Sequence, residues 1–181
     1  MLAIASLHGS TRAVVGALLF GTTLMALYTA STVYDVLHPG PGKRLARVVD
    51  HSAIYLLIAG TYTHFCLVTL KGPWGWSLFG LVWGLAAVGL AMKISIGFRL
   101  PKASLVLYLV MGWLALIATV PLLQRLPIPG LIWLAAGGLC YTSGVLFFVR
   151  GHLPFRHTAW HLMVLSGSLC HVVSITGWAL R

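Results

Sequence analysis

The sequence predicts an all-α protein, a polytopic transmembrane helical bundle with six transmembrane helices, and three observations carry this prediction. Of the 181 residues, 59% are hydrophobic and only 8% are charged, and the mean hydropathy is +0.95. Soluble domains average about 25% charged residues, so a water-facing surface all round the molecule is excluded. Six stretches of about 20 residues lack Lys, Arg, Asp and Glu, and that length crosses a bilayer. In lipid, only helices satisfy the backbone of such segments.

The expected spans follow one another along the chain, separated by short connectors rich in Gly, Pro and basic residues. The first connector contains His38-Pro-Gly-Pro-Gly42, which stops a helix. Proline marks the later boundaries at Pro73, Pro101, Pro127, Pro129 and Pro154. The helices are therefore expected at about residues 13–34, 51–70, 72–92, 103–124, 128–149 and 158–180.

No connector is long enough to hold a soluble domain, so we expect a single integral membrane domain over residues 1–181. Cys66, Cys140 and Cys170 lie inside apolar runs at wide spacing, which does not suit a disulfide framework or a zinc-binding C-x-x-C pattern. We also expect no secretory or organellar presequence, because no cleavage-site pattern precedes the first apolar stretch.

The twelve Lys and Arg residues predict the orientation of the bundle. Alternate connectors fall on alternate sides of the membrane, so the connectors 38–50, 93–102 and 150–157 share one side. That side receives eight basic residues against four on the other, which makes it cytoplasmic and the chain a multi-pass protein of the cell membrane with its N-terminus outside. The basic residues form no stripe interleaved with aromatics, so we expect membrane lipid, and no nucleic acid, as partner.

Asp35 and Asp50 are the only acidic residues in the chain. Asp35 ends the first span and Asp50 precedes the second, so both lie at the same membrane face. His157 and His161 open the last span from that face, and their spacing of four places them on one side of a helix. Ionisable residues in membrane segments are costly and generally face the bundle interior with a partner. We therefore expect these four side chains to meet.

Two imidazoles, one carboxylate and a water suit tetrahedral zinc with one open position, as in catalytic sites. We interpret Asp35, His157 and His161 as the metal ligands. Asp50 is either a further ligand or a base acting on the water at the metal. Ser31, on the helix face of Asp35, bonds either to the site or to its own helix. The other interpretation of the whole cluster is a His–Asp hydrogen-bond network that locks the bundle.

Three further histidines lie near or within the spans. His51 directly follows Asp50, so we expect its side chain to point away from Asp50 on a helix. His64 and His171 lie deeper, and we expect each to be packed and hydrogen-bonded within the bundle.

Several sequence blocks, taken together and in order, resemble a known family over roughly residues 20–175. The blocks are Ser31-Thr-Val-Tyr34, Val49-Asp-His-Ser-Ala-Ile-Tyr55, Ile58-Ala-Gly-Thr-Tyr-Thr63, Leu107-Tyr-x-x-Met-Gly-Trp113, Gly137-Gly-x-x-Tyr-Thr-x-Gly144 and His157-x-x-Trp160-His161. This combination resembles the bacterial hemolysin III proteins, members of the progestin and adipoQ receptor family that includes the adiponectin receptors.

The resemblance implies a seven-helix fold with a cytoplasmic N-terminus and a zinc ion near the inner leaflet. In the family the zinc is bound by the histidine of an S-x-x-x-H motif and by both histidines of an H-x-x-x-H motif. Ser31 and Asp35 match the first motif here, and His157 and His161 match the second. A third-helix aspartate, matched by Asp50, contacts the zinc-bound water. The wider superfamily includes alkaline ceramidases, so the implied activity is hydrolysis of a lipid amide.

The chain differs from the family pattern in three places. Position 35 is Asp where the family has the metal-binding histidine, the first helix has no counterpart, and His64 stands where proline is usual. An aspartate ligand would lower the metal's net positive charge, so its water should be less acidic than at a three-histidine site. Two other outcomes of this difference are possible: the metal site is weakened, or His38 replaces Asp35 as the ligand.

The leading hypothesis is a zinc-dependent membrane hydrolase, ceramidase-like, that acts on a lipid amide or ester, with Asp50 as base and Ser31 assisting. The alternative is a non-enzymatic membrane protein, either a sensor of lipid state or a cytolysin-like (hemolysin) protein, in which the zinc is structural.

Overall fold

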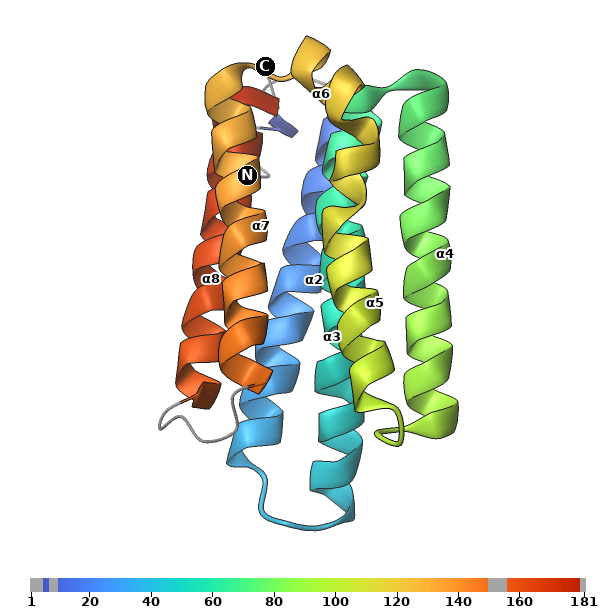
Figure 1. Cartoon of the computed structure of the whole chain (residues 1–181), viewed down its shortest axis with the longest axis vertical. Coiled ribbons are helices and arrows are strands. Elements are labelled where there is room, and N and C mark those ends of the chain that lie inside the picture. The colour runs from blue at the N-terminus through green and yellow to red at the C-terminus, as the bar shows by residue number, and fades with distance from the viewer. Residues whose placement is uncertain (1–4, 7–9, 150–155, 180–181) are drawn as a thin grey trace.

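The computed structural model describes residues 5–6, 10–149 and 156–179, without the side chains of 156 and 157. These residues form a bundle of long helices packed side by side (Figure 1). Within them, six helices are long and apolar enough to cross a membrane, and no strand is present. The predicted fold class, an all-α polytopic bundle with six spans, is confirmed.

The long helices run alternately up and down the bundle, and two of the spans end in a π-helical turn. In chain order the elements are α2 (Thr11–Val36), α3 (Pro41–His64), the π-helix η1 (Phe65–Leu70), α4 (Gly72–Ile96), α5 (Pro101–Trp113), the 3-10 helix η2 (Leu114–Ala118), α6 (Thr119–Arg125), α7 (Ile128–Val149), α8 (Arg156–Ser174) and the π-helix η3 (Ile175–Ala179).

The helix α3 begins at Pro41, well before residue 51, where the second span was expected to start. The expectation counted only uncharged residues, but Lys and Arg are good helix formers and proline suits a first helical turn. As a result, the basic residues 43–47 and Asp50 lie on the first turns of α3 and not in a loop.

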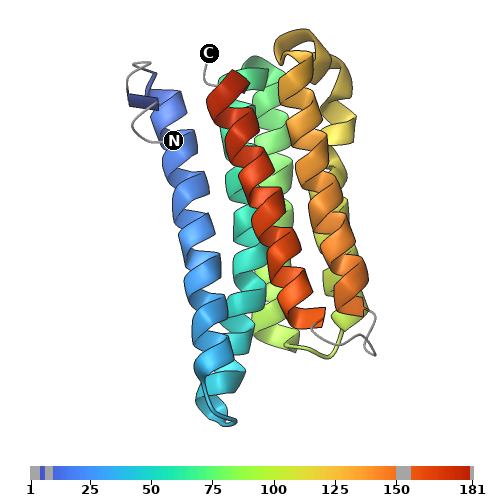
Figure 2. The ribbon, with the colours of Figure 1, turned by 90° about the vertical axis from the view of Figure 1, so that its left-hand side faces the viewer.

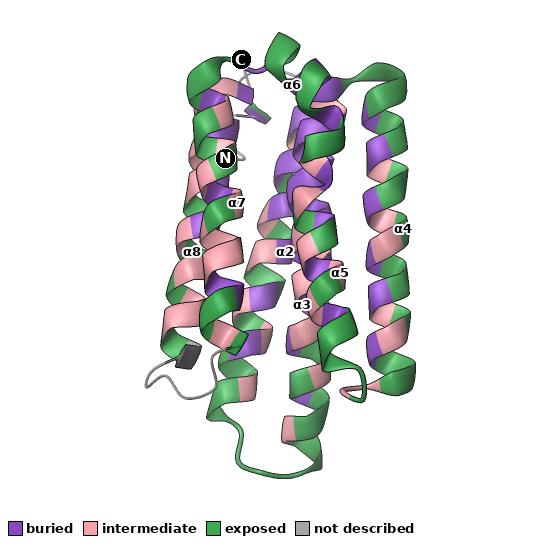
Figure 3. Ribbon diagram, viewed as in Figure 1, coloured by how far each residue is buried: buried purple, intermediate pink, exposed green. Residues whose placement is uncertain are grey.

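α3 is the central helix of the bundle. In the apolar stretch of this span, 67% of the residues are buried within the bundle, against 17–39% in the other five spans. Two groups of buried side chains meet on it: one joins α3 to α2 and α8, and the other joins α3 to α4 and α5. Figure 3 shows the exposed positions running along the outer side of α4 and α7. Large apolar side chains such as Ile94 on α4 and Met25 on α2 are exposed on the outside of the bundle, as expected where lipid is the solvent.

The fourth span is interrupted where α5 passes through η2 into α6. Pro121 has no backbone N–H, so it cannot complete the regular helical ladder across this break. Tyr62 of α3 compensates for the interruption, because its hydroxyl donates to the carbonyl of Gly112 at 2.9 Å and accepts from the N–H of Ala115 at 2.7 Å. Irregular backbone at membrane depth is tolerated when the protein itself supplies such partners.

Glycines allow two helix pairs to approach closely. On α2, a Cβ at Gly16 would lie 2.9 Å from the Cα of His64, so α2 and α3 touch backbone to backbone there. On α7, Gly137 makes room for the ring of His171. In the side view of Figure 2, α2 stands along one edge of the bundle and α8 lies beside α7.

The connectors 37–40 and 97–100 lie at the same end of the bundle, at the bottom of Figure 1. We name this end the basic end. Of the basic residues in the described chain, it carries Lys43, Arg44, Arg47, Lys93, Arg99 and Lys102. The opposite end carries Arg12, Lys71 and Arg125. This distribution follows the predicted alternation of the connectors.

Candidate functional site

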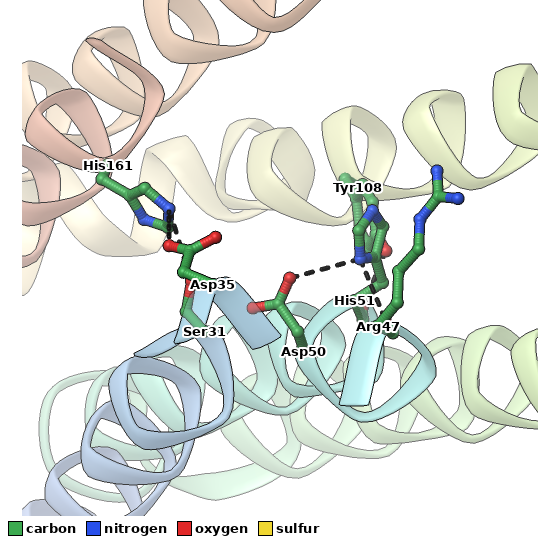
Figure 4. Close-up of polar contacts among 7 residues, drawn as sticks. All are labelled: Ser31, Asp35, Arg47, Asp50, His51, Tyr108 and His161. Atoms are coloured by element: carbon green, nitrogen blue, oxygen red, sulfur yellow. Dashed lines mark hydrogen bonds and ion pairs between the residues drawn. The ribbon is translucent and has the colours of Figure 1, made fainter. Parts of the chain in front are cut away.

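Asp35 and His161 come together near the basic end, although they are far apart in sequence. Nε2 of His161 on α8 lies 3.6 Å from Oδ2 of Asp35 on α2. The same nitrogen lies 3.4 Å from Oγ of Ser31, one helical turn before Asp35. Figure 4 shows the imidazole directed at the carboxylate, with the Ser31 side chain beneath it. This contact agrees with the first of the two roles expected for Ser31, a bond to the site.

The spacing of these two atoms fits a shared metal ligand set. Two ligand atoms that each lie about 2.0–2.1 Å from a tetrahedral zinc are about 3.4 Å apart. The 3.6 Å between Asp35 and His161 is close to that value, and both atoms are chemical types that zinc accepts. The side chains of Asp35 and His161 are 44% and 28% exposed, respectively, so an ion can reach them from outside the bundle.

The third expected ligand, His157, has its side chain outside the described residues. Its backbone lies in the first turn of α8, four residues before His161, so the two positions share a helix face. Among the side chains that the structure describes, no group of three or more His, Cys, Asp or Glu residues is placed to hold a metal. His38, the other ligand considered for this site, is exposed in the connector 37–40.

Asp50 pairs with its neighbour on α3, and not with Asp35 or His161. Its Oδ2 lies 3.3 Å from Nδ1 of His51. The prediction that His51 points away from Asp50 is wrong. Consecutive side chains leave a helix about 100° apart, yet the imidazole swings back along α3, where its Nδ1 also lies 3.0 Å from the carbonyl of Arg47. Tyr108 of α5 holds this turn by donating its hydroxyl to the carbonyl of His51 at 2.7 Å (Figure 4).

One cavity nonetheless connects Asp50 with the rest of the site. Ser31, Asp50, His51 and His161 all line a cavity of about 350 Å³. Most of the remaining wall surface is apolar, and the cavity continues between the helices as far as Leu70 and Leu122, near the other end of the bundle. The polar groups expected to do chemistry are therefore gathered at one end of a long apolar space.

A second hollow, of about 230 Å³, opens between α2 and α8. Asp35, Thr32 and Leu162 line it, and it shares Ser31, His161 and Tyr28 with the first cavity. The Asp35–His161 pair therefore stands at the junction of the two spaces. Tyr28 was not singled out from sequence, although its position three residues before Ser31 places it on the same face of α2.

The deep histidines behave differently from each other. Nε2 of His171 lies 3.3 Å from the carbonyl oxygen of Leu134, as expected for a packed, hydrogen-bonded side chain. His64 is fully buried, but neither of its ring nitrogens has a hydrogen-bond partner in the part of the chain that the structure describes. The expectation of a hydrogen bond is wrong for His64, because its ring packs against Gly16 and Phe65.

Together, the six spans and the polar cluster at one end of the cavity define a multi-pass membrane protein with a mainly apolar interior cavity. The sequence model of one family, described as Haemolysin-III related, matches residues 1–172. The chain belongs to this haemolysin-III-related family, which confirms the resemblance found in its sequence blocks.

Relatives cover most of the chain. It is 46% identical over 164 residues to Hemolysin-3 of Bacillus cereus, an alignment that spans 91% of this chain and 75% of that protein. It is 40% identical over 168 residues to the Hemolysin-3 homolog of Bacillus subtilis (strain 168), spanning 93% and 79%. The human monocyte to macrophage differentiation factor is 28% identical over 169 residues, spanning 90% and 70%. No solved structure matches the chain.

Proposed function

We propose that this chain is a zinc-dependent hydrolase of a lipid amide or ester in the cell membrane. Asp35, His157 and His161 would hold the metal, Asp50 would act as base and Ser31 would assist. The connectors 38–50, 93–102 and 150–157 would face the cytoplasm, so the site would lie at the inner leaflet. The observation that carries the proposal is the contact of His161 with Asp35 at the end of the apolar cavity.

The cavity supports a lipid as substrate. Its volume of about 350 Å³ lies in the usual range of ligand pockets, and its wall offers apolar side chains with a few polar groups at one end. An acyl chain lying between Leu70 and the site would place its carbonyl carbon beside His161 and Asp50. The second hollow, between α2 and α8, offers a route from the bilayer to the same point.

The reaction needs a base, a donor to the carbonyl oxygen and a Lewis acid. Zinc held by this ligand set would supply the polarisation of the substrate carbonyl. Asp50 takes the proton of the attacking water, and then returns it to the amine or alcohol that leaves. Ser31, which already lies 3.4 Å from His161, is placed to donate its hydroxyl hydrogen to the carbonyl oxygen. His51, 3.3 Å from Asp50, orients the base.

The metal content of purified protein tests the ligand set independently of any activity. We expect about one zinc per chain by inductively coupled plasma mass spectrometry, and its loss in His161→Ala. His171→Ala is the matched control. It also removes a histidine of α8, but one whose ring contacts the backbone carbonyl of Leu134. Wild-type protein without zinc after purification from zinc-supplemented cells, or equal zinc in all three, would remove the metal from the proposal.

Asp50→Asn tests the chemistry. This change keeps the shape of the side chain and removes the base, so hydrolysis of a ceramide-type amide or the matching ester should fall by about 10²–10⁴-fold. Product release is measured by mass spectrometry, with circular dichroism to show that the bundle is intact. Undiminished turnover would exclude Asp50 from the reaction.

The second candidate is a non-enzymatic membrane protein with a structural zinc, either a lipid sensor or a cytolysin-like protein. The names of the Bacillus relatives, Hemolysin-3 and the Hemolysin-3 homolog, favour it. Leakage of erythrocytes on addition of the protein, without any lipid product, would support this candidate. Lipid product without leakage would support the hydrolase.

A further inference from the structure

Three cationic or basic side chains surround one aromatic ring at the basic end. Phe98, in the connector between α4 and α5, has the guanidinium carbon of Arg47 at 4.0 Å and the ammonium of Lys93 at 4.5 Å from its ring centre. The imidazole of His51 meets the same ring edge-on, with centroids 4.9 Å apart. We name Arg47, Lys93, His51 and Phe98 the Phe98 cluster.

The two full positive charges of this cluster have no anionic partner in the described chain. Both contact a single ring, so they are at most about 8.5 Å apart and repel each other. The chain has only two carboxylate side chains, and these pair with histidines: Asp50 with His51 and Asp35 with His161. Among the described residues, neither Arg47 nor Lys93 forms a recorded ion pair or side-chain hydrogen bond.

Lys93 makes this arrangement costly, because it is only 2% exposed. A buried ammonium loses the water that would otherwise stabilise its charge, and the face of one aromatic ring replaces only part of that stabilisation. Arg47, by contrast, is exposed, so the cluster presents one side to the surroundings. A buried cation and an exposed cation on one ring therefore form a place that an anion would stabilise.

We propose that the Phe98 cluster binds the phosphate of an anionic membrane phospholipid. One guanidinium group can donate two parallel hydrogen bonds to two oxygens of a phosphate, and an ammonium adds a point charge. The surroundings favour a lipid over a soluble phosphate, because apolar side chains flank the cluster on both helices. Leu45 and Val49 of α3 are 66% and 49% exposed, and Ile94 of α4 is 75% exposed, so acyl chains can lie against them.

This site is distinct from the hydrolytic site proposed above and does not depend on it. His51 is the only member of the Phe98 cluster that also lines the interior cavity. Its Nδ1 lies beside Asp50, while its ring edge meets Phe98. A headgroup bound at the cluster would thus sit next to the polar end of the cavity and outside it.

Lipid retention by the purified full chain tests the proposal. The protein is placed in nanodiscs of phosphatidylglycerol and phosphatidylcholine, extracted in mild detergent, and its bound lipids are counted by native mass spectrometry. We expect the wild type to retain phosphatidylglycerol preferentially, and Arg47→Gln and Lys93→Met each to lower that preference by about fivefold. Lys102→Gln is the matched control, an exposed cation at the same end without a recorded contact to Phe98.

An unchanged preference in Arg47→Gln would overturn the proposal even if Lys93→Met fails to fold, because Arg47 is exposed and its loss leaves the core intact. An equal loss in Lys102→Gln would also overturn it, since the preference would then reflect general charge. Soluble glycerol phosphate at millimolar concentration should not displace the bound lipid. Displacement would show a site for free phosphate and overturn the choice of lipid.

Discussion

At the scale of single residues, the proposed site depends on the contacts of the two carboxylate side chains, Asp35 and Asp50. Asp35 occupies the position at which the hemolysin III pattern has a histidine, and it reaches His161 from α2 at 3.6 Å. A carboxylate is shorter than an imidazole and carries a negative charge. A metal at this site would therefore lie nearer to α2 and would carry less net positive charge than at a three-histidine site.

Substitution of Asp35 tests that role directly. Asp35→Asn should lower zinc retention against a chelator by at least about tenfold, because the amide keeps the shape but loses the charge. Asp35→His should retain zinc at least as well as the wild type. Zinc is measured by mass spectrometry after dialysis against the chelator.

Asp50→Asn supplies the matched control, since it makes the same chemical change at the other carboxylate. Retained zinc in Asp50→Asn would identify Asp50 as a base, and lost zinc would identify it as a ligand. Equal zinc in Asp35→Asn and in the wild type would mean that Asp35 is not a ligand, and the His–Asp hydrogen-bond network would become the better account of the cluster.

At the scale of elements, the contact between α2 and α3 supports the site, because Ser31 and Asp35 are carried by α2 and Asp50 by α3. The two helices approach most closely where Gly16 faces His64 and where Gly60 faces Thr23. Small residues at such crossings let helix backbones approach and gain van der Waals contact in lipid.

Gly16→Ala should therefore destabilise the bundle. The new Cβ would lie 2.9 Å from the Cα of His64, and backbone cannot move aside without shifting α3, so we expect a loss of about 1–3 kcal/mol. Gly21→Ala on the same helix is the control, since no other side chain or helix lies within 4 Å of its Cβ. It should be neutral or slightly stabilising, because alanine is the better helix former. Thermal unfolding in detergent measures both, and equal melting temperatures would contradict the close contact.

At the scale of the whole molecule, charge is distributed unevenly between the two ends, which predicts the orientation. Lys71 and Lys102 are both exposed and lie at opposite ends of the bundle. A membrane-impermeant maleimide should label Lys71→Cys in intact cells, but Lys102→Cys only after permeabilisation. The wild type is the control, because its three cysteines are free thiols within the spans. The reverse pattern would place the basic end outside.

Much of this architecture could be predicted because it depends on local pattern. Apolar length predicts the spans, and the parity of the connectors places Asp35 and His161 at one end. The features that could not be predicted from the sequence depend on three-dimensional packing. The start of α3 at Pro41 and the turn of His51 towards Asp50 depend on neighbours that periodicity does not reveal. The same holds for the ring of His64, which has no hydrogen-bond partner among the described residues. The Phe98 cluster was missed for the same reason, since Lys93 and Arg47 meet only after α3 and α4 have packed.

The burial of α3 has a consequence for biosynthesis. This helix is surrounded by protein in the finished bundle, yet it is made second among the described spans, before α4, α5 and α8 exist to cover it. Its buried Thr61, Thr63 and His64 would be poorly suited to lipid during that interval. The short connector 37–40 lets α3 fold back on α2 at once, so the two helices would leave the insertion machinery as a hairpin, with their glycine contacts already formed. The later helices would then assemble around this hairpin as each is synthesised.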